Sequence, residues 1–99
     1  MDERLTAVQF LEGAPSGWEA ADQTATATFR TGSFATGVDL VVAIGRLADD
    51  ANHHPDVLLR YPDVAVTLTT HDAGGLTQRD VDLARAITGS AAAMGVSPQ

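Results

Sequence analysis

The stretch that decides the fold is residues 33–70, which read SFATGVDLVVAIGRLADDANHHPDVLLRYPDVAVTLTT. Its first half predicts a helix from Ser33 to about Asn52, because Ser33 is a good N-cap and the apolar residues after it recur at helical spacing. Pro55 favours an extended conformation in the residue before it, so the helix is expected to end ahead of this proline.

The second half predicts a hairpin whose strands, 57–61 and 64–70, flank Pro62-Asp63. A loop symmetric about these two residues pairs Tyr61 with Val64, Leu59 with Val66 and Val57 with Leu68. Continued past the strand ends, this register places His54 opposite His71, where directly paired Cβ atoms lie about 4.5–5.5 Å apart. A one-residue bulge would break that pairing.

The apolar residues of the expected helix cover a wider arc than one buried face requires. Phe34, Val38, Val41, Val42 and Gly45 lie on one stripe, and Leu40, Ile44 and Leu47 lie on its flank. A helix that packs only on a sheet usually keeps a clean polar half. Two interpretations stay open: another subunit covers the flank, or the core stripe is simply thick.

Toward the N-terminus the pattern predicts a further helix and a first hairpin. Asp2 is a possible cap for a helix over 3–12, which Gly13 would end. An extended piece opens at Gly17-Trp18, and residues 24–30 alternate like a strand after a turn.

Toward the C-terminus a turn at 72–75 precedes a helix that Thr77 caps and that runs to about Ala93, followed by a tail expected to fray. The order of elements is therefore αββαββα. Sequential hairpins give a four-stranded antiparallel sheet, and helices packed on one face of it make an α+β fold. We expect a single domain over residues 1–99.

The composition excludes several classes of chemistry. The 99 residues carry 6 basic and 13 acidic side chains, for a formal net charge of −7, with no cysteine and with arginine at every basic position. Disulfides, thiolate sites and Schiff-base lysines are therefore excluded. Scattered arginines in an acidic chain disfavour nucleic-acid binding. Because the sequence has no apolar run of bilayer length and no signal-peptide pattern, we expect a cytoplasmic protein with no membrane partner.

Three histidines and one aspartate are candidates for chemistry. His53, His54 and His71 fall at the open ends of the expected hairpin, and Asp49 precedes His53 by one helical turn. An imidazole donates or accepts a proton near neutral pH, and an adjacent carboxylate fixes its tautomer. Taken singly, each histidine is better explained as an ordinary helix-end, pre-proline or strand-end residue. Zinc is a weaker interpretation, because a His-His-Pro run lacks the usual i, i+4 spacing of a metal pair, and we expect no metal.

Three further side chains each allow a structural and a functional explanation. Thr77-Gln78-Arg79-Asp80 has the spacing of a capping box, so we expect Asp80 first to cap its helix. Trp18 and Tyr61 are aromatic rings that could stack on a flat heterocycle, but we expect both to close the core.

The motif Asp49-x-x-x-His53-His54-Pro55, followed by Tyr61, His71 and Asp80, resembles the signature of the pterin-4a-carbinolamine dehydratase family. The match extends through residues 52–56, 69–77 and 83–84, and Gly17-Trp18 falls where that family has its early tryptophan. The order of helices and strands agrees over nearly the whole chain.

The resemblance implies a cofactor-free enzyme that dehydrates 4a-hydroxytetrahydropterin to quinonoid dihydropterin and so recycles the pterin used by aromatic amino-acid hydroxylases. It also implies a homodimer or homotetramer. The implied catalytic set is His53, His54 and His71, in which His53 and His71 share the acid and base roles and His54 positions the pterin. The implied substrate-binding or orienting set is Asp49, Asp80, Trp18 and Thr70.

The chain departs from the family pattern at two places, with Asp49 where glutamate is frequent and Val57 where tryptophan is frequent. A shorter carboxylate reaches less far and a missing indole loosens a pocket wall, which bears on substrate preference and rate more than on reaction class. A function from a different class is a non-catalytic oligomeric partner that stabilises another protein's dimer through an exposed helix face. A metal hydrolase is the remaining alternative.

Overall fold

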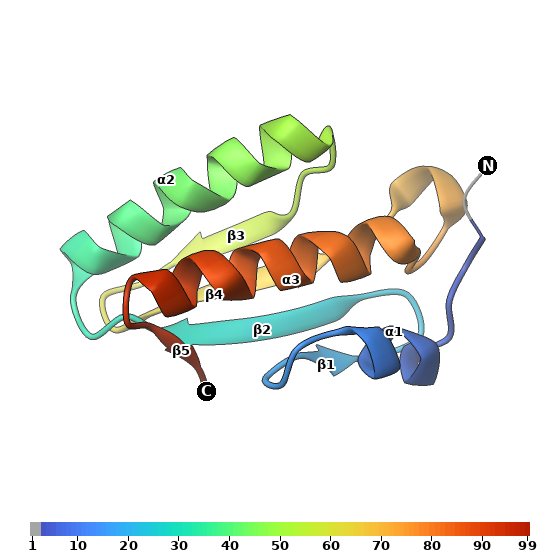
Figure 1. The fold of residues 1–99 in the computed structure, drawn as a ribbon, viewed down its shortest axis with the longest axis horizontal. Coiled ribbons are helices and arrows are strands. Elements are labelled where there is room, and N and C mark those ends of the chain that lie inside the picture. Colours follow the sequence, from blue (N-terminus) through green and yellow to red (C-terminus); the bar gives the residue numbers. More distant parts are fainter. Residues whose placement is uncertain (1–2) are drawn as a thin grey trace.

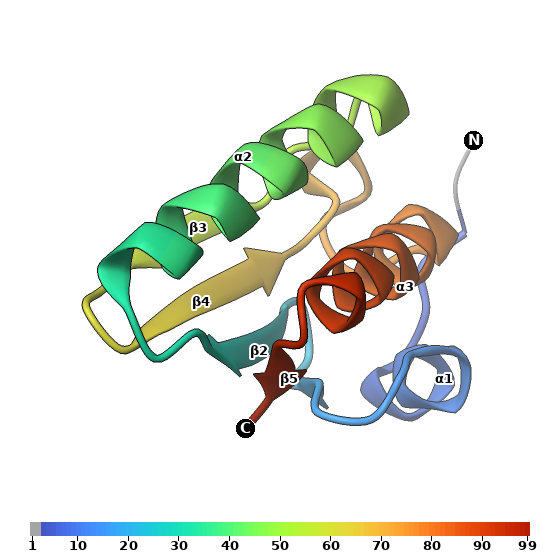
Figure 2. The ribbon, with the colours of Figure 1, turned by 60° about the vertical axis from the view of Figure 1, so that its left-hand side comes forward.

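A computed structural model describes residues 3–99 and shows an antiparallel sheet that carries its helices on one face (Figures 1 and 2). The helices are α1 (Ala7–Gly13), α2 (Phe34–Ala51) and α3 (Gln78–Ala93), with a short 3₁₀ helix, η1 (His71–Ala73). The strands are β1 (Glu19–Ala20), β2 (Ala25–Arg30), β3 (Asp56–Leu59), β4 (Asp63–Leu68) and β5 (Ser97–Pro98). The predicted α+β class is confirmed.

The core lies between the sheet and its layer of helices. The strand order is β1-β2-β4-β3, with β5 also pairing with β2. Alternate side chains of the two central strands are buried on the helix side, namely Ala25, Ala27 and Phe29 of β2 and Val64, Val66 and Leu68 of β4. In Figure 2, α2 and α3 run side by side over this face. No helix within residues 3–99 is both long and apolar enough to cross a bilayer.

Helix α2 begins and ends where its sequence predicts, but its buried face is not the expected one. Ser33 caps it by accepting the Thr36 N–H, and Asn52 ends it. The residues that enter the core are Gly37, Leu40, Ile44 and Ala48, and the stripe expected to be the core, Phe34, Val38 and Val42, remains 40–50% exposed. What was expected to be the flank is therefore the core face.

The second hairpin is shifted by two residues from the expected register. Val57 lies opposite Val66 and Leu59 opposite Val64. The cause is a two-residue turn that lies one residue earlier than expected, at 61–62, and that Arg60 and Asp63 close through reciprocal backbone hydrogen bonds of 2.9 and 3.4 Å. The Asp63 carboxylate also accepts two hydrogen bonds from the Arg60 guanidinium, at 3.1 and 3.2 Å. Because a shift of two keeps the alternation of side chains, the apolar face is unchanged.

Three expectations at the ends and turns are wrong. Helix α1 starts after a capping box at Thr6, not at residue 3, and Asp2 lies outside the described residues. The C-terminal tail does not fray, because Ser97 and Pro98 pair with β2 as strand β5. Tyr61 stands in the hairpin turn with 70% of its surface exposed, so it does not close the core.

Candidate functional site

The end of α2 separates the two neighbouring histidines. Asn52 adopts a left-handed conformation with φ of 49°, and its N–H and that of His53 bond back to the last turn of the helix. The chain reverses here, so His53 leaves the helix and does not share a face with Asp49, contrary to the expectation. His53 is buried and His54 is exposed.

His53 forms a buried pair with Asp80 of α3. The His53 Nε2 and Asp80 Oδ1 atoms are 2.6 Å apart, and the two side chains are 8% and 0% exposed. A contact this short between an imidazole and a carboxylate is a charge-assisted hydrogen bond. The fold therefore joins the start of β3 to the start of α3 through a titratable pair.

The Asp80 carboxylate also binds two threonines. Its Oδ2 accepts the Thr70 hydroxyl at 2.7 Å and the Thr77 backbone N–H at 2.9 Å. The Thr77 hydroxyl lies 2.9 Å from that of Thr70, and both threonines are buried. The capping box predicted for Thr77 and Asp80 is confirmed. The sequence does not show that the capping carboxylate also holds His53.

His54 pairs with Asp49 in solvent. The His54 Nε2 and Asp49 Oδ1 atoms are 2.9 Å apart, and the side chains are 59% and 81% exposed. Water and salt screen such a pair strongly, so it contributes little stability. The expected partnership of Asp49 with an imidazole exists, but the imidazole is that of His54.

His71 lies beside this network without sharing a ladder with His54. The chain turns into η1 at His71, and a bridge between Thr70 and Gly75 closes that turn. The expected cross-strand pair of His54 and His71 is therefore wrong. His71 directly follows Thr70, which bonds to the carboxylate that holds His53, but His71 does not line the cavity beside His53. The turn sits at the same end of the molecule as the end of α2 (Figure 1).

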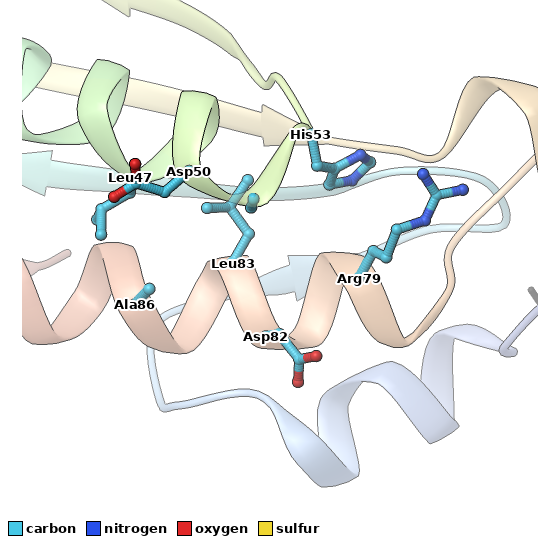
Figure 3. Close-up of a pocket in the computed structure, with 8 residues that line it drawn as sticks. Leu47, Asp50, His53, Arg79, Asp82, Leu83 and Ala86 are labelled. Atoms are coloured by element: carbon cyan, nitrogen blue, oxygen red, sulfur yellow. The ribbon is translucent and has the colours of Figure 1, made fainter.

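A cavity of about 360 Å³ opens beside His53, between the last turns of α2 and the first half of α3. Figure 3 shows His53 and Arg79 close together at one end of it, and Leu47 and Asp50 toward the other. The lining consists of Leu47, Asp50 and Ala51 from α2, Arg79, Asp82, Leu83 and Ala86 from α3, and His53.

Apart from His53, the side chains that line this cavity were not identified as site residues from the sequence. Residues 79, 82, 83 and 86 have the i, i+3, i+4, i+7 spacing of one helical face, which is the signal that could have found them. Arg79 also forms an ion pair of 3.0 Å with Asp72 of η1. This hydrogen bond is the main reason that the pKa of Asp72 is lowered.

Trp18 belongs to the core and lies apart from the residues that surround His53. Its ring packs edge-on against Phe10 and Phe29, with centroids 6.4 and 6.2 Å away. Its indole N–H donates to the Thr88 hydroxyl at 2.9 Å, and the side chain is 5% exposed. The structural explanation of Trp18 is therefore the one observed.

The arrangement suits proton transfer. It holds two imidazoles, each with a carboxylate at Nε2, one buried beside a cavity and one in solvent. Within residues 3–99, no three histidine, aspartate or glutamate side chains are grouped so that they could hold a metal ion. A general acid or base needs a positioned side chain near the reacting atom, which a histidine lining a cavity provides.

Comparisons with known proteins find a matching family and similar chains. The family model described as pterin 4 alpha carbinolamine dehydratase matches residues 2–89. A relative from Natronomonas pharaonis is 42% identical over 84 residues, 85% of this chain and 91% of its own. One from Roseiflexus is 43% identical over 89 residues, 88% and 96% of the two chains. Both carry the dehydratase name as a provisional assignment.

A solved structure extends the likeness to three dimensions. The crystal structure of a Brucella melitensis protein, described as a transcriptional coactivator/pterin dehydratase, has a TM-score of 0.80 and 31% sequence identity. The match covers 88% of this chain and 97% of that one. From the family model, the two relatives and this shared fold, we conclude that the chain belongs to the pterin-4-alpha-carbinolamine dehydratase family.

Proposed function

We propose that this protein dehydrates 4a-hydroxytetrahydropterin to quinonoid dihydropterin and water by acid–base catalysis without a cofactor. The observation that carries the proposal is the buried pair of His53 and Asp80, 2.6 Å apart at the edge of a cavity of about 360 Å³. Cavities of about 300–1,000 Å³ accommodate small-molecule ligands, which includes a bicyclic pterin.

The reaction needs two proton transfers. The C4a–O bond breaks as the leaving hydroxyl takes up a proton and departs as water, and the N5–H bond gives its proton to a base, so the net change is the loss of one water. An imidazole performs either transfer near neutral pH. His53 and His71 share these roles in our proposal.

The other site residues act by orientation. His54 positions the pterin, and the 2.9 Å contact with Asp49 supports an ordered ring for that purpose. Asp80 and Thr70 hold His53 from within the protein. Because Trp18 is buried in the core, we assign it to the fold and not to pterin binding.

The test is the rate at which the 4a-carbinolamine disappears, followed by absorbance for the wild type, His53→Ala and His71→Ala against the uncatalysed background. We expect clear acceleration by the wild type and a large drop in both variants with the circular dichroism spectrum unchanged. Arg46→Ala, an exposed change on α2, is the matched control and should retain the wild-type rate. No acceleration by folded wild type would refute the dehydratase.

A binding role for the same fold has its own supporting observation. Phe34, Val38 and Val42 form an exposed apolar stripe on α2, and the Brucella relative is described as a coactivator as well as a dehydratase. Exposed stripes of this kind mark interaction surfaces. We propose that a second copy of this chain covers the stripe in a homodimer or homotetramer, and that this assembly is what would stabilise a partner's dimer.

Light scattering of the purified protein tests the assembly. We expect a mass of two or four chains that falls in Val42→Asp and not in Ala21→Asp, which adds the same charge on an exposed turn. A monomer in the wild type would contradict the proposal. A partner whose capture persists in His53→Ala would favour the binding role, because that role needs no histidine chemistry.

A further inference from the structure

We propose that His53 exchanges protons through Nδ1, and that the hydroxyls of Thr70 and Thr77 are the positioning groups that fix this tautomer by holding Asp80. The consequence for the rate rests on the proposed dehydratase function. The tautomer itself follows from the hydrogen bonds and is measured without substrate.

The first step concerns the donors around Asp80. An ionised carboxylate only accepts hydrogen bonds. The Oδ2 atom of Asp80 already receives the Thr70 hydroxyl at 2.7 Å and the Thr77 N–H at 2.9 Å, and the residue has no exposed surface. The remaining neighbour of Oδ1 is His53 Nε2 at 2.6 Å. That nitrogen therefore carries the proton of the neutral ring.

The second step concerns the direction of the hydroxyl bonds. Thr70 has one hydroxyl proton and gives it to Asp80. The Thr77 hydroxyl, 2.9 Å from that of Thr70, must then be the donor of this pair, while its oxygen accepts the Arg79 N–H at 3.3 Å. The two hydroxyls thus point one after the other toward the carboxylate. Such chains strengthen each bond in a buried, low-dielectric environment.

The third step is the contrast with the neighbouring histidine. His54 also faces a carboxylate through Nε2, but both partners are mostly exposed and water competes for each of them. No buried donors fix Asp49, because its side chain is 81% exposed. Of the two neighbouring imidazoles, His53 is the one whose tautomer the protein dictates, and its Nδ1, on the ring edge away from Asp80, is the acceptor.

Nuclear magnetic resonance of the ¹⁵N-labelled wild type decides the tautomer directly. Long-range ¹H–¹⁵N correlations, assigned with His53→Ala, separate a ring protonated at Nε2 from one protonated at Nδ1. We expect neutral His53 to be protonated at Nε2 and His54 to populate both forms. A His53 ring protonated at Nδ1, or an even mixture, would overturn the inference whatever the variants do.

The hydroxyls are tested by Thr70→Val, which keeps the shape of the side chain and removes its proton donor. We expect kcat for the dehydration to fall by about 10-fold to 100-fold with KM little changed, the range typical when the hydrogen-bond partner that orients a metal-binding histidine is removed. His53 should also populate the Nδ1–H form. Thr70→Ser should restore the rate and the tautomer, because it returns the hydroxyl.

The matched control is Thr28→Val, the same chemical change on β2, where Thr28 pairs with Ala65 far along the ladder from Thr70. It should leave the rate and the His53 tautomer as in the wild type. A Thr70→Val protein with wild-type kcat and tautomer would overturn the role of the hydroxyls. A wild type that shows the Nε2 tautomer but no dehydration would refute the proposed function alone.

Discussion

Replacing Asp80 by asparagine removes a charge at the point where three hydrogen bonds meet. The carboxylate accepts from the Thr70 hydroxyl, the Thr77 N–H and His53 Nε2, at 2.7, 2.9 and 2.6 Å. The asparagine oxygen replaces one acceptor atom and serves the two threonine donors. Its amide N–H₂ then faces His53 Nε2, so the neutral ring has to carry its proton on Nδ1 and accept this bond.

The magnitude follows from these three bonds. A hydrogen bond to a charged group contributes about 1.5–3 kcal/mol, and a neutral one about half as much, so the two retained bonds lose about 2 kcal/mol together. The bond to His53 also becomes one between two neutral groups, which adds about 1 kcal/mol to the loss. We therefore expect Asp80→Asn to lower the free energy of unfolding by about 2–4 kcal/mol, a large part of the roughly 5–15 kcal/mol typical of a domain.

Urea unfolding followed by circular dichroism measures this loss. The matched control is Asp82→Asn, two residues along the same helix, where the exposed carboxylate accepts from Gln78 at 2.9 Å. An exposed change of this kind should cost no more than about 0.5 kcal/mol. A loss below about 1 kcal/mol for Asp80→Asn, or one equal to that of the control, would show that Asp80 is not the charged centre of this network.

Four further variants test stability. Trp18→Phe should lower the free energy of unfolding by about 1–3 kcal/mol, because it removes the hydrogen bond to Thr88 and leaves a gap in the core. An unchanged urea midpoint would contradict the place of Trp18 in the core. Gly89→Ala should raise the free energy of unfolding by up to about 1 kcal/mol, because alanine favours the helix more than glycine does. The added Cβ has no neighbouring atom within 4 Å, so it causes no collision in α3. Gly17→Ala should destabilise, because φ is +100° and the Cβ would collide with Pro98, and thermal melts of the two glycine variants should shift in opposite directions. Arg79 holds the pKa of Asp72 below its ordinary value of 3.8, so this carboxylate stabilises the fold above that pH and the contribution is lost as the pH falls through the lowered pKa. When urea unfolding is measured at several pH values, Asp72→Asn should therefore lose less stability than the wild type between about pH 5 and pH 2. Equal losses in the two proteins would show that the ion pair of Asp72 with Arg79 does not stabilise the fold.

Local patterns predicted the bounds of the two long helices, α2 and α3, well and the contacts between distant segments poorly. The caps at Ser33 and Thr77 are encoded within four residues, and both are where the sequence places them. The hairpin register was missed by two residues because it depends on which turn Arg60 and Asp63 close. Strand β5 was missed because Ser97 gains its partner from Arg30, far away in the sequence.

The candidate site shows the same division. Sequence pattern and resemblance together selected His53, Asp80 and Thr70, which the structure brings together around one carboxylate. They could not assign Asp49 to its histidine, because that depends on how Asn52 turns the chain at the end of α2. The cavity needs two helices to be placed side by side, which no single stretch of sequence specifies.

The left-handed residue at the end of α2 has a consequence for chemical labelling. Asn52 turns the chain so that two adjacent, chemically identical side chains face different surroundings, with His53 8% and His54 59% exposed. An acylating reagent for imidazoles should therefore modify His54 and the exposed His71 quickly and His53 slowly. Peptide mapping over time would then give two different rates of acylation for the adjacent residues His53 and His54.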